Sequence, residues 1–269
     1  MIIDFHTHIF PEKIAARTIA LLSEKGGIPP FSDGTVAGLL QRMEEAGAEL
    51  AVTLPVLTSP TQFESVTRFA CEINQRFRNE RCRLISFAGI HPRCEDIEGK
   101  MKRIRESGFL GVKIHPDYQE TFICDEGYVR ILECAREYDL IVVTHAGADV
   151  AYRDLPMRCP PHLARELIRK VPHAKLVLAH LGGSECFEEV LELLCGEDVH
   201  LDTAYVLPMI DKPLFERILN KHGADRILFA SDSPWGDIGQ SVSLLRAFAP
   251  DKTTEERILW KNAWDLLGI

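Results

Sequence analysis

Short apolar runs alternate with amphipathic helical patterns along the whole chain. The runs are continuous and rich in Val, Ile and Leu, which is typical of parallel strands buried on both faces. The pattern predicts eight strands, at residues 2–6, 50–54, 84–90, 110–115, 140–145, 175–180, 199–203 and 226–231. Strands that recur at this spacing with helices between them indicate an α/β protein with a parallel sheet.

Apolar residues at helical spacing fill the intervals between these strands. One apolar helix face is predicted within residues 61–79, another from Ile97 to a stop at Gly108, and a third after the pair Pro160-Pro161. Strand–helix alternation favours right-handed crossovers. Eight repeats in 269 residues fit a closed (β/α)₈ TIM barrel better than an open sheet, so we expect one barrel domain over residues 1–269.

Two segments have more than one interpretation. The Gly- and Pro-rich segment 26–34 lies between two helical patterns and is either an active-site loop or a plain connection. The Leu- and Trp-containing segment 258–267 covers either its own barrel or a partner chain. Packing on its own barrel is the simpler hypothesis, and a homo-oligomer stays open.

Composition narrows the class of partner. Asp and Glu number 40 against 31 Lys and Arg, which gives a formal net charge of -9. This charge argues against nucleic acid or an anionic membrane as the main partner. The apolar runs fall short of the roughly 18 residues of a membrane helix. We therefore expect a small-molecule substrate.

The cysteines and the N-terminal run bear on the cellular compartment. The eight cysteines form no C-x-x-C pair, so a cysteine zinc knuckle is not expected. The run MIIDFHTH enters a strand pattern directly, without the basic and apolar regions of a signal peptide. Reduced thiols in the cytoplasm are the simplest interpretation.

Histidines gather at the predicted strand ends. Six of the ten lie there: His6, His8, His91, His115, His145 and His180. In a barrel, these ends meet at one rim, where the following loops carry the chemistry. His6 and His8 are two residues apart on one strand, so both imidazoles point to the same face and can reach one ion. Two imidazoles, a third from another strand and a carboxylate suit Zn²⁺, with Mn²⁺ or Fe²⁺ as alternatives.

Four motifs at successive strand ends carry a family resemblance. They are Ile3-Asp4-Phe5-His6-Thr7-His8, His145-Ala146-Gly147, Ala179-His180-Leu181-Gly182-Gly183 and Ser231-Asp232-Ser233-Pro234-Trp235. In this order they resemble the amidohydrolase superfamily, and more narrowly its amidohydrolase 2 branch. That branch includes aminocarboxymuconate-semialdehyde decarboxylase and the resorcylate-type decarboxylases, besides hydrolases. The resemblance covers almost the whole chain.

The resemblance implies roles for the residues that match these motifs. His6, His8, His145 and Asp232 are implied as metal ligands, and Asp232 also as a group that shuttles a proton. His180 is implied as a ligand of a second ion in binuclear members, or as a catalytic acid/base in mononuclear ones.

The fourth predicted strand departs from the family pattern. Binuclear members often carry a carboxylated lysine or a glutamate there, whereas this chain has Lys113 and, two residues later, His115. Lys113 is either that bridge or an inward lysine that binds substrate or pairs with a barrel carboxylate. We expect one ion rather than two, and we expect Lys113, His115 and His91 to contact substrate. Asp4, deeper on the first strand, is either an orienting acceptor or a buried hydrogen-bonded residue.

The working hypothesis for function is hydrolysis. A metal-activated water would attack the carbonyl of an amide, ester or lactone, with Asp232 and His180 moving protons. The alternative is a metal-dependent, non-oxidative decarboxylase of a small carboxylic acid, in which Arg93, Arg153 or Arg158 clamps a second carboxylate. Tyr118, Tyr152 and Trp235 would wall the pocket or simply pack. A phosphoesterase and a non-catalytic binding barrel are less favoured.

Overall fold

All the paired strands run parallel. They form two sheets, which together make up the wall of one barrel. The computed structural model describes residues 1–78, 80 and 83–269. One sheet has the order β1 (Ile3–Thr7), β2 (Leu50–Thr53), β3 (Arg83–Ser86). The other has the order β4 (Ala88–Gly89), β5 (Gly111–Ile114), β6 (Ile141–Thr144), β7 (Leu176–Leu178), β8 (His200–Asp202), β9 (Ile227–Leu228).

Backbone hydrogen bonds join the two sheets at both seams. β3 and β4 follow one another with only Phe87 between them, and Phe87 N–H donates to Thr53 O over 3.0 Å. At the other seam, Phe5 N–H donates to Phe229 O over 2.9 Å, and Asp232 N–H to His6 O over 2.9 Å. The ring is therefore closed, and the predicted (β/α)₈ barrel is confirmed. The predicted strand 84–90 is divided at Phe87.

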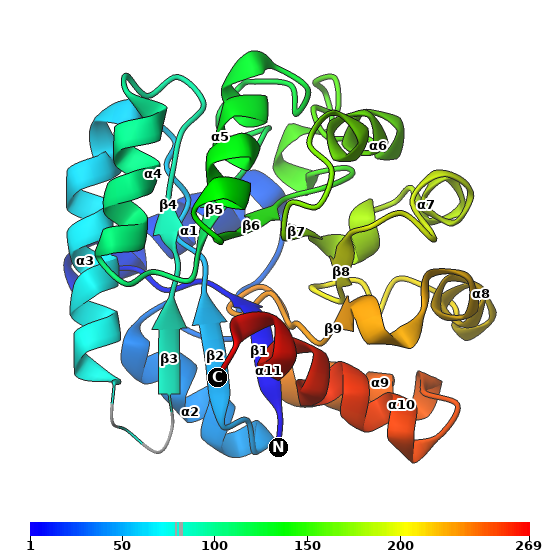
Figure 1. The fold of residues 1–269 in the computed structure, drawn as a ribbon. Helices are drawn as coiled ribbons and strands as arrows, with labels where there is room; N and C mark the ends of the chain where they lie inside the picture. Colours follow the sequence, from blue (N-terminus) through cyan, green and yellow to red (C-terminus); the bar gives the residue numbers. More distant parts are fainter. Residues whose placement is uncertain (79, 81–82) are drawn as a thin grey trace.

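Helices surround the ring of strands (Figure 1). They are α1 (Glu12–Gly26), α2 (Val36–Ala46), α3 (Phe63–Arg76), α4 (Ile97–Glu106), α5 (Glu126–Glu137), α6 (Pro161–Lys170), α7 (Phe187–Leu193), α8 (Lys212–His222), α9 (Ile238–Phe248), α10 (Lys252–Glu256) and α11 (Asn262–Leu267). Short helical turns are η1 (Pro60–Gln62), η2 (Val150–Tyr152), η3 (His180–Gly182), η4 (Ala224–Arg226) and η5 (Arg257–Lys261). The three predicted helix faces correspond to α3, α4 and α6. Asn79, the last residue of the first predicted face, and Cys82 lie outside the described residues.

Two hydrophobic clusters form the core. The larger contains outward strand residues and the inner faces of the surrounding helices, for example Val142 with Leu167. The smaller contains inward strand residues such as Phe5 and Val143, together with Ala263 and Leu267 of α11. Segment 258–267 thus packs on its own barrel, and Figure 1 shows α11 beside β1.

The loop after α1 runs beside the segment that carries Asp232. Phe31 N–H donates to Pro234 O over 2.7 Å. This contact favours the interpretation of segment 26–34 as a loop of the candidate site over a plain connection. In the described part of the chain, no helix is long and apolar enough to span a membrane.

Candidate metal centre

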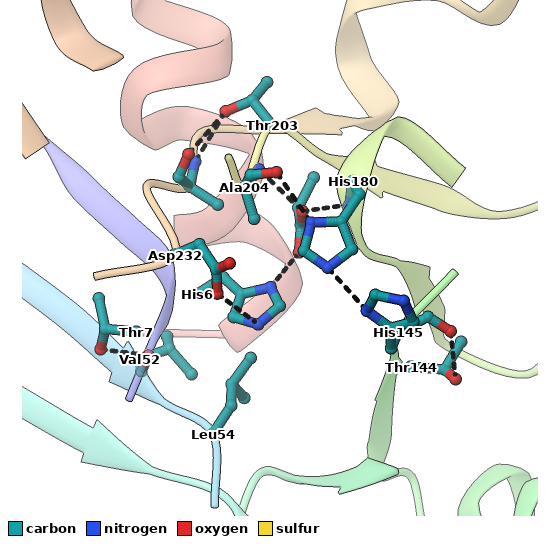
Figure 2. A network of polar contacts seen from close by, with 12 residues as sticks. His6, Thr7, Val52, Leu54, Thr144, His145, His180, Thr203, Ala204 and Asp232 are labelled. Carbon is teal, nitrogen blue, oxygen red and sulfur yellow. Dashed lines mark hydrogen bonds and ion pairs between the residues drawn. The ribbon is translucent and has the colours of Figure 1, made fainter. Parts of the chain in front are cut away.

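The six strand-end histidines lie at the same rim of the barrel, because all the strands that carry them are parallel. His6 belongs to β1 and His8 follows it, and the other four lie within two residues after the ends of β4, β5, β6 and β7. Figure 2 shows that the side chains of His6, His145, His180 and Asp232 point toward one another. This arrangement is the one expected from the strand-end pattern.

His6, His8 and Asp232 form the first cluster. The two Nε2 atoms are 3.2 Å apart. Asp232 Oδ1 lies 3.5 Å from His6 Nε2 and 3.2 Å from His8 Nε2. These ligand atoms lie within 4.8 Å of one another, which is the spacing of atoms that share one ion.

Hydrogen bonds on the far side of each ring fix where its proton sits. His6 Nδ1 is 2.9 Å from Asp202 Oδ2, and His8 Nδ1 is 2.9 Å from Leu54 O. Both partners are acceptors, so each Nδ1 carries the proton and each Nε2 of the neutral ring presents a lone pair. Two lone pairs and one carboxylate oxygen therefore face each other, and this group of acceptors requires a cation.

A metal ion meets this requirement better than a proton. Burial, and next the charge of Lys113, lower the pKa of His6 well below its usual value. Burial raises the pKa of Asp232, but its close contact with His8 and the other nearby histidines outweigh it and lower the pKa to about 2. Neutral imidazole nitrogens with an ionised carboxylate are the donor set of Zn²⁺, Mn²⁺ or Fe²⁺. The residues present fit a divalent ion.

Lys113 brings a buried amine to the same cluster. Its Nζ lies 3.1 Å from His6 Nε2, and its side chain is fully buried. Burial lowers the pKa of Lys113 to about 8, against the opposing influence of Asp202 and Asp232. The amine therefore stays mostly protonated at neutral pH.

His145 and His180 form a second pair of facing rings. His180 Nε2 lies 2.9 Å from His145 Nδ1, and His180 Nδ1 lies 2.9 Å from Ala204 O (Figure 2). The ring nitrogens of this pair are not within 4.8 Å of all the ligand atoms of His6, His8 and Asp232. The role of His145 as a fourth ligand therefore remains a prediction.

A glycine lets the two loops that carry this pair approach closely. Gly147 has φ +84°, and a Cβ there would lie 2.1 Å from Ser184 N. Ala148 N–H donates to Ser184 O over 2.9 Å, and Ser184 N–H to Ala146 O over 3.1 Å. Only glycine allows this contact, which keeps His145 beside His180.

His115 belongs to a stacked column rather than to a ligand set. Its ring is parallel to that of His145 within 11°, with centroids 4.3 Å apart, and it stacks on Tyr118 at 4.0 Å. His115 Nε2 also lies 3.4 Å from Asp149 Oδ2. Ligand atoms of His115, His145 and Asp149 lie within 4.8 Å, but the lone pairs of parallel rings lie in separate planes and do not converge on one ion.

The remaining predicted contacts are engaged within the protein. His91 is buried, and its Nδ1 accepts from Arg93 N–H over 3.1 Å. Burial and the charge of Arg93 lower the pKa of His91 to about 4. Arg93 donates to loop carbonyls, Arg153 pairs with Glu185, and Arg158 lies 3.5 Å from Asp117.

Asp202 is a site residue that sequence reasoning missed. Its carboxylate accepts from His6 Nδ1, and from the backbone N–H groups of His180 and Ala204 over 3.0 Å each. It ends β8 at the rim of the histidines, and that position was the available signal. Asp4, by contrast, accepts from Ser231 Oγ over 2.5 Å and from Ser231 N–H over 2.9 Å, so it is the buried hydrogen-bonded residue of the two alternatives.

A sequence model of the amidohydrolase family matches residues 3–269. The chain belongs to the amidohydrolase family. Comparison with curated protein sequences gives no match. The family assignment agrees with the four strand-end motifs.

Solved structures of decarboxylases share the fold of this amidohydrolase. A 5-carboxyvanillate decarboxylase from Sphingomonas paucimobilis has 15% identity and a TM-score of 0.70, over 100% of this chain and 99% of that one. A 2,6-dihydroxybenzoate decarboxylase from Rhizobium has 15% identity and a TM-score of 0.69, over 99% and 98%. A dihydroxybenzoic acid decarboxylase from Polaromonas, which holds manganese and an inhibitor, has 15% identity and a TM-score of 0.70, over 99% and 96%.

Proposed function

We propose that this amidohydrolase is a metal-dependent decarboxylase that removes CO₂ from a small carboxylic acid without an oxidant. The observation that carries the proposal is the buried amine of Lys113. Its hydrogen-bond partner is His6 Nε2, and among the described residues no carboxylate forms an ion pair with it. A substrate carboxylate would form a direct ion pair with this amine, whereas a neutral amide, ester or lactone would not.

Metal binding sharpens this argument. An ion held by His6, His8 and Asp232, with His145 as the predicted fourth ligand, would occupy the lone pair that Lys113 now faces. The ammonium would then lie beside a second cation, with no acceptor of its own. An anionic substrate group satisfies both charges. The solved decarboxylases of the same fold support the same choice, and the manganese in one of them makes Mn²⁺ an alternative to the expected Zn²⁺.

Asp232 would move the proton. An ion held by His6, His8 and Asp232 would supply Lewis acidity toward the substrate oxygens. Asp232 is ionised at neutral pH, so it first accepts the proton of a substrate hydroxyl next to the carboxylate. It then delivers a proton to the carbon that carried the carboxylate, as that C–C bond breaks and leaves its electron pair on the carbon. CO₂ leaves, and the step needs no oxidant.

The test compares decarboxylation, which breaks a C–C bond and releases CO₂, with hydrolysis of a C–O or C–N bond at a carbonyl. Protein loaded with Zn²⁺ or Mn²⁺ is assayed against hydroxybenzoates, including 2,6-dihydroxybenzoate and 5-carboxyvanillate, and against esters, lactones and amides. We expect CO₂ release, and in D₂O one deuterium at the carbon that lost the carboxylate. Turnover of esters, lactones or amides without CO₂ release from any acid would refute the proposal.

A matched lysine pair tests the carrying observation. Lys113→Met should retain the ion but lose turnover, because the substrate carboxylate loses its buried partner. Lys175→Met is the control, since Lys175 is an exposed lysine whose partner is Asp139. Normal turnover by Lys113→Met would remove the basis of the proposal.

Hydrolysis is the second candidate, and the pKa of Lys113 favours it in one respect. An amine with a pKa of about 8 is partly neutral at pH 7 and can react with CO₂ to form a carbamate. Such a group would bridge two ions, as in binuclear members of the superfamily. Two ions per chain together with a carbamate signal after ¹³C-bicarbonate labelling would favour hydrolysis over decarboxylation.

A further inference from the structure

Three buried polar atoms near the ring of His145 have no hydrogen-bond partner and lie close to one another. They are His145 Nε2, Asp117 Oδ2 and Arg158 Nη1. His145 Nε2 lies 3.9 Å from Asp117 Oδ2, and Arg158 Nη1 lies 3.5 Å from the other oxygen, Oδ1. Buried groups of this kind are rarely left unpaired, so the gap between the imidazole and the carboxylate calls for an explanation.

The position of one proton on His145 decides which contacts are satisfied. With the proton on Nδ1, His145 donates to His180 Nε2 over 2.9 Å. That choice leaves His145 Nε2 and Asp117 Oδ2 as two buried acceptors that face each other. With the proton on Nε2, a small approach of the two groups gives a hydrogen bond to Asp117.

A proton on His145 Nε2 changes which nitrogen lone pairs the two rings direct into the site. His180 Nδ1 donates to Ala204 O, so His180 Nε2 carries a lone pair when the ring is neutral. A proton on His145 Nε2 would leave His145 Nδ1 as a second lone pair, 2.9 Å from the first. Two facing lone pairs can accept a cation between them, as we predict for those of His6 and His8.

We propose that Asp117, in an ion pair with Arg158, is a positioning residue that keeps the proton of His145 on Nε2 and directs the Nδ1 lone pair into the site. His145 then offers Nδ1, rather than Nε2, toward the interior. Nothing in the strand-end motifs assigns this role to Asp117, which lies in the turn after β5. The inference rests on the proposed function only in that the site binds a divalent ion.

Histidine ¹⁵N NMR tests the proposal without any substrate. Long-range ¹H–¹⁵N spectra of metal-free and Zn²⁺-loaded protein report which ring nitrogen carries the proton. His222 is an internal reference for the Nε2–H form, because its Nε2 faces Val199 O and its Nδ1 accepts from Gly196 N–H. We expect His145 in the Nε2–H form in the Zn²⁺-loaded protein, where the ion takes the lone pair on Nδ1. The Nδ1–H form in the Zn²⁺-loaded protein would overturn the proposal.

An isosteric variant tests the cause. In Asp117→Asn, Arg158 holds the amide oxygen, so the NH₂ group faces His145 Nε2 and forces the proton to Nδ1. We expect that shift, with Zn²⁺ affinity lower by about 10–100-fold. Asp149→Asn is the control, because Asp149 contacts the stacked neighbour His115 instead. An unchanged His145 spectrum in Asp117→Asn would overturn the proposal.

The two proposals fail in different ways. If the protein hydrolyses esters, lactones or amides but His145 shows the Nε2–H form, only the proposed function is wrong. If Asp117→Asn does not fold, the spectrum of the unaltered protein still decides the position of the proton.

Discussion

Asp202→Asn tests how the protein prepares His6 for a metal ion. The substitution preserves volume but replaces one carboxylate oxygen with an NH₂ group. One oxygen of Asp202 already accepts from two backbone N–H groups, those of His180 and Ala204, over 3.0 Å each. The amide oxygen will keep that place, so the NH₂ group faces His6 Nδ1. His6 must then accept at Nδ1 and carry its proton on Nε2.

The expected loss of metal affinity follows from the hydrogen bond that His6 Nδ1–H can no longer make when the ion binds at Nε2. Binding at His6 Nε2 requires the proton to return to Nδ1, where it would meet the NH₂ donor of the substituted side chain instead of a carboxylate at 2.9 Å. Losing a hydrogen bond to a charged group costs about 1.5–3 kcal/mol. That cost lowers metal affinity by about 10–100-fold.

The assay is a competition titration of Zn²⁺ and of Mn²⁺ against a chelator of known affinity. Asp198→Asn is a matched control, because Asp198 also faces a histidine, His173, at 3.2 Å, but both side chains are exposed. We expect the control to bind metal like the unaltered protein. Equal affinities in Asp202→Asn and the control would show that the Asp202 contact does not prepare His6.

Three further predictions follow from the same geometry. Replacing His6 and His8 together by alanine should abolish tight metal retention, and unchanged metal by elemental analysis would refute the ligand assignment. His180→Asn should keep fold and metal while kcat falls at least about 100-fold; lost metal would make His180 a ligand, and normal kcat would leave it structural. Burial lowers the pKa of His222 to about 4, so the unfolded chain binds more protons below its usual pKa of about 6.5. Stability should therefore fall by up to about 3 kcal/mol as pH drops from 6.5 toward 4. Urea unfolding of His222→Gln should show a shallower fall, and an identical one would contradict the assignment.

The sequence predicts the strands well because their apolar runs are unbroken. It predicts the cluster of His6, His8 and Asp232 because strand ends of a barrel must meet. It leaves the role of Asp4 open between two alternatives, since period-two alternation puts Asp4 and His6 on one face. The register between β1 and β2 shifts between Asp4 and Thr7, so Asp4 contacts Ser231 while His6 faces the cluster.

Other parts of the site depend on tertiary contacts that no local pattern carries. The parallel stacking of His115 on His145 is set by two separate loops, and a strand-end position alone cannot reveal ring orientation. Asp202 and Asp117 have the residue type of ordinary surface aspartates. Their roles emerge only when the histidines they face are in place.

An ion held by His6, His8 and Asp232 would join the first and last strands of the barrel, at the seam between β1 and β9. His6 and His8 leave the ribosome long before Asp232, which follows β9 at the far end of the strand order. An ion cannot find its full ligand set until all the strands of the barrel have been synthesised. Once bound, it would act as a clasp between the two ends of the barrel wall. A bound ion would then add to the backbone hydrogen bonds that already close this seam, and would oppose its opening.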